Sequence, residues 1–352
     1  MLDINPQNIN KFNNLLSAAT DIVITSHMKP DGDALGSSIA LHGFLKSAGK
    51  KSTVVLPHRY PSNLGFLTVV EDTGAIIIHE ENPAAAEAAF TSSDLIICLD
   101  FNAFHRTDKL EPALSSSKAA KVLIDHHLNP DRNNFEVSFS ETEVSSASEL
   151  LYHILMAMPQ TGGDAGKLPV SSLNALMTGM TTDTNNFANS VYPSTLLMAS
   201  GLLAAGADRD MILSNLYNMF GESRLRLLGH MLKDLMTVTG DGVAYIVLDS
   251  DTLKRHNVNE GDTEGFVNMP LSIRDVRMSI LIKEDEGKAR VSIRSKKGTS
   301  ANRCAMKYFN GGGHENAAGG RLMIPQDIES IEMAGRYIET NTHRFFNDEN
   351  EK

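Results

Sequence analysis

Cysteine is scarce in this 352-residue sequence, and no hydrophobic run approaches the ~20 residues that a membrane-spanning helix needs. The two cysteines, Cys98 and Cys304, lie in a strand-like and a helix-like segment, which argues against a disulfide framework and predicts two small buried residues. The N-terminal segment also lacks the basic start and apolar core of a secretory signal. We therefore expect a cytoplasmic protein that does not bind a membrane.

Positive charge is also in short supply, because 32 lysines and arginines face 43 aspartates and glutamates and leave a formal net charge of -11. A chain of this charge is unsuited to bind long duplex nucleic acid or a membrane surface through general attraction to phosphates. A short anionic ligand held in a local pocket is compatible with it. With 41% hydrophobic residues, the chain is long enough to form two domains with sizeable cores.

The first half of the sequence alternates between short β-branched runs and helical patterns, in the order typical of a parallel α/β sheet. The runs that end at Leu99 and Ile124 are apolar throughout, as in strands that are buried on both faces. We therefore predict a parallel sheet with helices on both faces. The predicted strands are 21–26, 51–56, 74–79, 94–99 and 121–124, and the predicted helices are 34–49, 145–158 and 170–184.

The second half changes character. Residues 277–284 and 288–295 form two strand-like runs joined by a short turn, which predicts an antiparallel hairpin. We therefore expect an N-terminal catalytic domain at 1–208, a linker at 209–222 and a smaller C-terminal α/β domain with antiparallel strands at 223–352. The active site is then expected in the cleft between the two domains.

Acids and imidazoles follow the predicted strands of the first half, at the point where each strand ends. The carboxyl ends of neighbouring parallel strands share one edge of the sheet, so these side chains are expected to converge. Several buried aspartates at one edge would repel each other and take up protons, whereas divalent cations remove that conflict. The residues are His27, Asp31, Asp33, Asp100, Asp125, His126 and His127, together with Asp183 at the end of a predicted helix.

This mixture of ligands indicates a centre of two metal ions. Asp31 and Asp33 lie two residues apart on a constrained loop, so each can serve a different ion, and a single carboxylate such as Asp100 can bridge the two. Two ions about 3.5 to 4 Å apart activate water and stabilise both the attacking and the leaving oxygen at a phosphorus centre. Mixed nitrogen and oxygen ligands favour Mn²⁺ over Mg²⁺, which prefers oxygen.

Each motif taken alone also has an ordinary structural explanation. The segment 29–36 suits a turn in which Asp33 caps a helix, and Asp125 with its two following histidines suits a surface cluster. The repetition of such residues at successive strand ends favours the metal site, because independent surface turns have no reason to share these positions.

The second half offers two segments that suit an anion. In 309–320, three glycines precede His314 and a small-residue stretch that we predict to begin a helix, so that backbone amides would approach a phosphate. The alternative for this segment is a flexible turn. Arg294 lies on the polar face of its strand, and a guanidinium binds phosphate at two points. The alternative here is a solvated edge strand guarded by Lys296 and Lys297.

Taken together, these motifs resemble those of the DHH/DHHA1 phosphoesterase family over nearly the whole chain. Four segments match the family's metal-site motifs in order, and a fifth matches the signature of its C-terminal domain. Within the family, the chain is most similar to the short members called nanoRNases, or oligoribonuclease and 3′-phosphoadenosine 5′-phosphate (pAp) phosphatases. The matching segments are SHMKPDGDALGS, CLDFNAFHR, LIDHH, TGMTTDTNNF and GGGHENAAGG.

The resemblance implies a metal-binding role for six residues. Asp100 would bridge two Mn²⁺ ions per chain, with Mg²⁺ or Co²⁺ as substitutes. One ion would be held by His27, Asp31 and Asp100, and the other by Asp33, Asp100, His126 and Asp183.

The resemblance also implies which residues act on the substrate. His127 would face the scissile phosphate, and Asp125 would orient an imidazole, as metal-bound histidines usually require. Arg106 receives no role, since the segment after Asp100 lacks the Arg-Leu-Gly run expected of many relatives, and Lys29 is also left without a role. The second domain would grip the phosphate and nucleotide through Arg294, Gly312, Gly313 and His314.

The implied activity is that of a Mn²⁺-dependent phosphoesterase that removes mononucleotides from short oligoribonucleotides and converts pAp to AMP. Hydrolysis of cyclic dinucleotides such as cyclic di-AMP, or of their linear products, is the closest alternative, and a non-catalytic nucleotide-binding regulator is a third. The glycine-histidine motif disfavours a pyrophosphatase, and the net charge disfavours a processive single-strand DNA exonuclease. A homodimer is left open.

Overall fold

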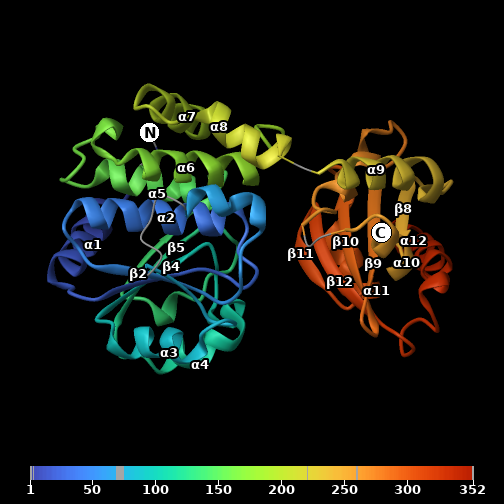
Figure 1. The fold of residues 1–352 in the computed structure, drawn as a ribbon, viewed down its shortest axis with the longest axis horizontal. Helices are drawn as coiled ribbons and strands as arrows, with labels where there is room; N and C mark the ends of the chain where they lie inside the picture. Colours follow the sequence, from blue (N-terminus) through green and yellow to red (C-terminus); the bar gives the residue numbers. More distant parts are fainter. Residues whose placement is uncertain (1, 3, 69–74, 220, 259–260, 351–352) are drawn as a thin grey trace. The chain divides into compact units, whose positions relative to one another are not determined.

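The computed structural model describes residues 2, 4–68, 75–219, 221–258 and 261–350, and the chain divides into two compact units at 1–219 and 220–352 (Figure 1). Gly74, in the strand predicted at 74–79, and Phe220, in the linker predicted at 209–222, lie outside the described residues. Among the helices of the described ranges, none combines the length and the apolar character that crossing a bilayer requires. Both cysteines are buried, as predicted.

The N-terminal unit contains a parallel sheet of six strands in the order β3-β2-β1-β4-β5-β6. The five predicted strands are confirmed. The sixth strand, β6, is missing from the sequence prediction because its four residues, VSFS, are short and half polar. The strands are β1 (Ile22–Thr25), β2 (Ser52–Leu56), β3 (Ile76–Ile78), β4 (Leu95–Leu99), β5 (Ala120–Asp125) and β6 (Val137–Ser140).

Helices cover both faces of this sheet, as predicted (Figure 1). Successive side chains along a strand point to opposite faces of the sheet, so each strand contributes to two separate hydrophobic clusters. Ile22 and Ile24 of β1 pack with the larger helical layer, whereas Val23 between them packs on the opposite side. One side carries α1 (Pro6–Ala18), α2 (Gly32–Ser47), α5 (Ala147–Ala157), α6 (Val170–Asp183), α7 (Pro193–Ala204) and α8 (Arg209–Leu213), and the other carries α3 (Pro83–Ser92) and α4 (Glu111–Ser116).

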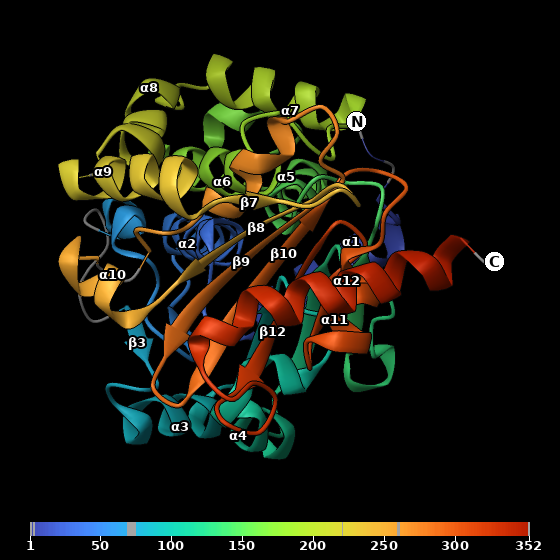
Figure 2. The ribbon, with the colours of Figure 1, turned by 90° about the vertical axis from the view of Figure 1, so that its right-hand side faces the viewer.

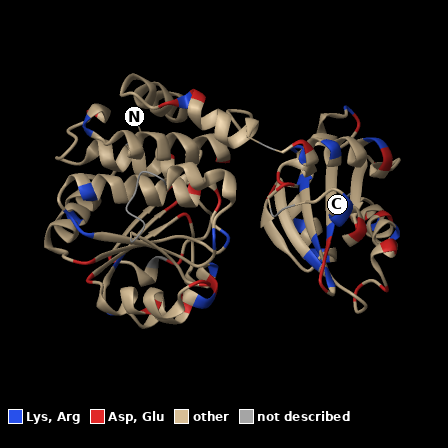
Figure 3. Ribbon diagram, viewed as in Figure 1, with Lys and Arg blue, Asp and Glu red and all other residues tan. Residues whose placement is uncertain are grey.

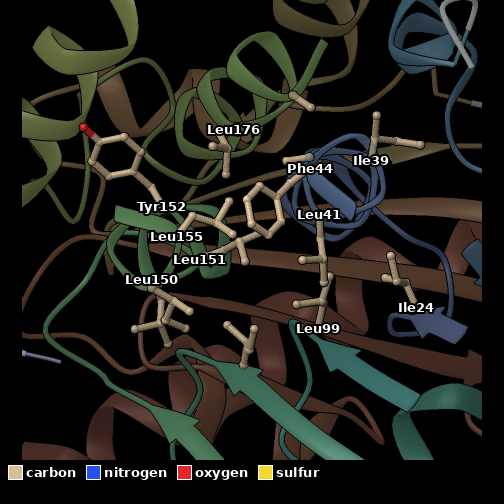
Figure 4. Packing of buried hydrophobic residues seen from close by; sticks show 14 of the residues in the cluster. Ile24, Ile39, Leu41, Phe44, Leu99, Leu150, Leu151, Tyr152, Leu155 and Leu176 are labelled. Atoms are coloured by element: carbon tan, nitrogen blue, oxygen red, sulfur yellow. The ribbon is translucent and has the colours of Figure 1, made fainter. Parts of the chain in front are cut away.

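The layer of α2, α5 and α6 is closely packed against the strands. Figure 4 shows Phe44 of α2 beside Leu151 and Leu155 of α5, with Leu176 of α6 in the same cluster. All four residues are almost completely removed from solvent. Because α2 and α6 carry Asp33 and Asp183, this packing also sets the spacing of two candidate metal ligands.

A glycine contact holds α2 close to α6. A Cβ atom at Gly36 would lie 2.6 Å from the carbonyl oxygen of Ala175 and 3.0 Å from the amide nitrogen of Gly179. We expect Gly36→Val to destabilise the N-terminal unit by about 1–3 kcal/mol, because the backbone of α6 must move to admit the side chain. Urea unfolding measures this change. Gly65→Ala is the control, since its added methyl group meets nothing within 4 Å; equal stability of both variants would contradict the prediction.

The C-terminal unit contains a second six-stranded sheet in the order β11-β12-β10-β9-β8-β7. The predicted antiparallel hairpin is confirmed as β9 and β10, but the sheet is mixed, because β8 and β9 are parallel. Its strands are β7 (Thr237–Val238), β8 (Val243–Leu248), β9 (Met278–Asp285), β10 (Lys288–Ser295), β11 (Gly312–His314) and β12 (Ala317–Met323).

Two helices pack on one face of this second sheet, and Figure 2 shows them lying across its strands. The opposite face is covered at β8 and β9 by a smaller apolar cluster that includes Leu227 and Phe266. At β10 that face is polar, and Figure 3 shows lysine and arginine segments along these strands. The helices on the first face are α11 (Ala301–Tyr308) and α12 (Ala334–Asn350), and the unit also contains α9 (Glu222–His230) and α10 (Ser250–Arg255).

One expectation for the second half is wrong, and so is one of the alternatives. The small residues after His314 form a β-hairpin of β11 and β12 and not a helix. They are small because the backbones approach closely: a Cβ at Gly320 would lie 2.1 Å from the carbonyl oxygen of Phe309. The alternative of a solvated edge strand at Arg294 is also wrong, since β10 pairs with both β9 and β12.

Candidate metal centre and substrate-binding residues

The strand order reverses between β1 and β4, which are neighbours at the centre of the first sheet. In open α/β sheets, ligands bind beside the carboxyl ends of the strands at such a reversal. His27 follows β1 by two residues and Asp100 follows β4 directly, so both residues lie at this position. Asp100 has a φ of 62°, a left-handed conformation that is rare outside glycine and that functional sites often contain.

The first group of candidate ligands consists of His27, Asp31 and Asp100. His27 Nε2 lies 3.3 Å from Asp100 Oδ2 and 3.9 Å from Asp31 Oδ1. His27 Nδ1 lies 2.8 Å from the carbonyl oxygen of Met28, which can only accept, so Nδ1 carries the proton of this bond. In its neutral form the ring therefore presents the Nε2 lone pair toward two carboxylates, an arrangement that calls for a cation between them.

The second group consists of Asp33, His126 and Asp183. His126 Nε2 lies 3.3 Å from Asp183 Oδ2 and 4.0 Å from Asp33 Oδ2. It also lies 3.4 Å from Asp100 Oδ1, so Asp100 contacts a histidine of each group through a different oxygen. The structure thus brings together all six residues for which the family resemblance implies metal binding.

The charges of these groups conflict when no cation is bound. Burial by itself would lower the pKa of the histidines, but their contacts with Asp100 raise the pKa of His27 to about 9 and that of His126 to about 10. Burial and the charge of Asp100 raise the pKa of Asp33 to about 7, and burial also raises the pKa of Asp183. Burial would raise the pKa of Asp100 too, but the two histidines hold it well below its usual range. Protons thus take the place that divalent cations would take among these donors.

These donors fit divalent cations by their chemistry. Imidazole nitrogens and carboxylate oxygens suit transition metals of the Mn²⁺ type, and each group offers three donor atoms within 4.8 Å of one another. Asp100 Oδ1 is buried and accepts no hydrogen bond from the described residues, so it retains capacity for a ligand.

Asp33 is held by the start of helix α5, a contact that sequence reasoning missed. The backbone N–H of Ala147 donates to Asp33 Oδ2 at 2.6 Å, and that of Ser148 donates to Asp33 Oδ1 at 2.9 Å. These bonds fix the orientation of the carboxylate. The helix N-terminus also favours its negative charge, against the burial and the charge of Asp100 that raise its pKa. The residues are more than a hundred positions apart, and the only signal in the sequence is Ser146 as the helix cap.

A buried glutamate secures the same helix start. Glu149 accepts hydrogen bonds from the amide of Ser145 and from the hydroxyl of Thr195, and it lies 3.6 Å from His153. Burial alone would raise the pKa of Glu149, but these contacts lower it from 4.5 to about 2. The ionised group therefore contributes to stability above about pH 4.5, and that contribution is lost as the pH falls from there toward about 2.

We expect Glu149→Gln to lower the thermal unfolding midpoint at pH 7 and the difference from wild type to shrink as the pH falls below about 4.5. The reason is that protonation removes from the wild type the charge that the variant already lacks. Melting curves followed by circular dichroism at several pH values measure this effect. Glu87→Gln, in the exposed part of α3, serves as the control. A difference that stays constant down to pH 3 would contradict the assignment.

His127 has a different environment from His126. Its Nδ1 lies 2.7 Å from Asp125 Oδ1, and Asp125 is completely buried at the end of β5. The carboxylate therefore orients this imidazole through Nδ1. His127 also forms a third group of donors with Asp100 and His126, so distance alone permits a metal-binding role as well.

The candidate substrate residues lie in the C-terminal unit. Register pairs Arg294 with Ala317 and Ala317 with His314, so Arg294 and His314 project from the same face, two strand spacings or about 10 Å apart. The Arg294 guanidinium donates to the carbonyl oxygens of Ile293 and Ala318. Among the described residues, no carboxylate lies within ion-pair distance of it, and burial lowers its pKa. A partly buried guanidinium of this kind suits an anion.

The two glycines before His314 differ in their surroundings. Gly312 is paired with Gly319 on the face that Arg294 also occupies. Gly313 has a φ of 154°, and its amide already donates to Asn302 Oδ1 at 2.9 Å. The amide of Gly313 therefore forms its hydrogen bond within the C-terminal unit. The close approach of the strands explains why this position has no side chain.

Comparisons with known proteins agree with this description. Residues 21–180 match the model of the DHH family, N-terminal domain, and residues 240–337 match that of the DHHA1 domain. The chain is similar to an exopolyphosphatase-related protein from Bacteroides fragilis, with 35% identity, a TM-score of 0.90 and 98% of each chain covered.

Two curated relatives match almost the whole chain. A probable bifunctional oligoribonuclease and PAP phosphatase, NrnA, from Streptococcus mutans is 28% identical over 90% of this chain and 94% of its own length. The bifunctional oligoribonuclease and PAP phosphatase NrnA of Bacillus subtilis is 25% identical over 90% of this chain and 94% of its own length.

A third relative matches only part of the chain. A cyclic-di-AMP phosphodiesterase, PdeA, from Listeria monocytogenes is 24% identical over 56% of this chain and 30% of its own length.

The matched domains follow one another in the order that the motifs predict, and they lie in separate compact units. The first contains the groups of histidines and aspartates, and the second contains Arg294 and the glycine-histidine hairpin. The resemblance seen in the sequence is thereby confirmed. The chain belongs to the DHH family, as a phosphoric ester hydrolase composed of a DHH domain and a DHHA1 domain.

Proposed function

We propose that this protein is a Mn²⁺-dependent phosphoesterase that hydrolyses short oligoribonucleotides to mononucleotides and converts pAp to AMP. The observation that carries the proposal is the position of Asp100, whose two oxygens lie 3.3 Å from His27 and 3.4 Å from His126. A single carboxylate between two sets of donors suits a bridge between two cations. His27 and Asp31 would complete one site, and Asp33, His126 and Asp183 would complete the other.

Divalent cations bound there would lower the pKa of a water molecule and neutralise the charge of the phosphate. The protein's own residues would supply position and proton transfer. Asp125 holds the imidazole of His127 through Nδ1. With a proton on each ring nitrogen, His127 would donate from Nε2 to the phosphate or to the leaving oxygen. The amides of α5 would keep Asp33 in place and favour its ionised form.

The second unit would recognise the nucleotide. Arg294 has no carboxylate partner among the described residues, and the phosphate of a substrate would supply the anion that its guanidinium can bind. His314 on the same face would donate a further hydrogen bond, and Gly312 would allow a substrate to approach the backbone. We assign these residues to substrate binding. Gly313 would support them indirectly, because its amide donates to Asn302 and so shapes the hairpin that carries His314.

The choice of substrates is supported by the curated relatives that match this chain along most of its length, because their names describe an oligoribonuclease and PAP phosphatase. Short substrates of this kind also suit a chain whose net charge is -11, since they need only a local patch of positive charge.

The test is an incubation of the purified protein with Mn²⁺ and, in parallel, a short RNA, pAp, cyclic di-AMP and pyrophosphate. We expect mononucleotides from the RNA and AMP from pAp. The partial match to a cyclic-di-AMP phosphodiesterase makes cyclic di-AMP the second candidate, and preferential hydrolysis of that substrate would replace the first proposal. Binding of Mn²⁺ without turnover of any of the four would indicate a regulator.

A further inference from the structure

Three loops at the edge of the first sheet meet around one peptide bond, the bond between Met28 and Lys29. Its carbonyl oxygen accepts from His27 Nδ1 at 2.8 Å. Its N–H, which belongs to Lys29, donates to His58 Nδ1 at 3.1 Å. His58 lies in the loop that follows β2, and its Nε2 lies 3.2 Å from Oδ2 of Asp108, in the turn after Phe104. Asp108, His58, the peptide bond and His27 therefore form a series of contacts that ends at a candidate metal ligand.

The roles of the two His58 nitrogens follow from their partners. A backbone N–H can only donate, so His58 Nδ1 must accept from Lys29. In the neutral imidazole the proton is then on Nε2, and it is donated to the carboxylate of Asp108. Asp108 thus sets the tautomer in which His58 can hold the peptide.

The peptide bond transmits this contact to His27. Because a peptide unit is planar, fixing its N–H at one end fixes the direction of its carbonyl at the other. That carbonyl oxygen accepts the Nδ1 proton of His27, and the Nε2 lone pair of His27 consequently faces Asp31 and Asp100. Such partners of ligating histidines orient the ring and tune its affinity for metal.

Two residues in this series of contacts have an unusual backbone conformation. Lys29 has a φ of 53° and Asp108 a φ of 52°, and both values are rare for residues with a side chain. A conformation of this kind persists only where surrounding contacts enforce it. The contact between His58 and Asp108, together with the bond from the Met28 amide to the Arg106 carbonyl at 2.7 Å, supplies such enforcement.

We propose that His58 and Asp108 are positioning residues that orient His27 through the peptide bond between Met28 and Lys29 and thereby raise the affinity of the first metal site. This inference rests on the proposed function, since it takes His27 and Asp31 as ligands. It assigns a role to the backbone of Lys29 and to two residues outside the family's metal-site motifs quoted above.

The test compares the Mn²⁺ affinity of full-length variants by isothermal titration calorimetry. His58→Phe removes both ring nitrogens, and we expect Mn²⁺ to bind this variant about 10-fold or more weakly at one site. His58→Asn retains an acceptor at the place of Nδ1, and we expect it to restore most of the affinity. His230→Phe is the matched control, because His230 also contacts an aspartate and has a similar side-chain exposure, 24% against 22% for His58.

The outcomes separate this inference from the proposed function. Wild-type protein that binds no Mn²⁺ would overturn both. Wild-type binding with equal affinity in His58→Phe, or an equal loss in His58→Asn and His58→Phe, would overturn the inference alone. Circular dichroism of the metal-free variants checks folding. If His58→Phe does not fold, Asp108→Asn takes its place, and unchanged Mn²⁺ affinity in that variant would likewise overturn the inference.

Discussion

Replacing Asp100 with asparagine is expected to reduce kcat/KM for both short RNA and pAp on the order of 10³-fold or more. The variant keeps the shape of the side chain but removes the charge that contacts both His27 and His126. Asparagine also offers a single oxygen, so it cannot serve two cations in the way that a carboxylate can. We expect calorimetry to show weaker Mn²⁺ binding at both sites, which separates this variant from one that damages a single site.

A control is available at the other end of the same strand. Asp94 precedes β4 and accepts hydrogen bonds from Thr20 and Asp21, far along the strand from Asp100. Asp94→Asn therefore alters a carboxylate on the same element, and we expect it to retain activity. Wild-type turnover by the Asp100→Asn protein, once folding is verified, would end the proposal of a bridged metal centre.

His127→Asn is expected to lower kcat by about 10²- to 10³-fold while leaving Mn²⁺ affinity close to that of the wild type. Asparagine can keep the hydrogen bond to Asp125 through its side-chain amide, but it has no group at the place of Nε2. The variant thus removes the nitrogen that we assign to the phosphate and preserves the contact that positions it.

The same variant distinguishes the two roles that distance permits for His127. If it is a metal ligand, as its group with Asp100 and His126 allows, Mn²⁺ affinity will fall and excess Mn²⁺ will restore turnover. If it acts on the substrate, added Mn²⁺ will not restore kcat. His105→Asn, a change to an exposed histidine in the turn after β4, controls for unrelated effects of the substitution.

Much of the N-terminal fold was predictable, because its signals are local. The run that ends at Leu99 is buried on both faces, and such a run is typical of a central strand in a parallel sheet. Asp100 follows it directly, so its place at the carboxyl edge of the sheet could be read from the order of residues. The hairpin of β9 and β10 was predictable for the same reason, since a short turn between two strands leaves few other pairings.

Contacts between distant segments were not predictable. The segment expected to form a helix after His314 is a strand. Its Gly320 is a glycine because the backbone of Phe309 approaches it too closely for a side chain. The two amides on Asp33 come from a helix 114 residues further along the chain. His58 was not distinguished from other histidines, because nothing in its neighbourhood reveals the peptide that it holds.

The sequence by itself determined the types of donor and their order along the chain, because strand ends and hydrophobic periods are properties of short segments. Only the tertiary structure decided which donors share a site. That choice depends on the strand order, which places β1 beside β4, and on the contact of Gly36 with α6, which sets the spacing of α2 and α6. Both depend on packing between segments far apart in the chain, where side-chain volume and backbone hydrogen bonds act together.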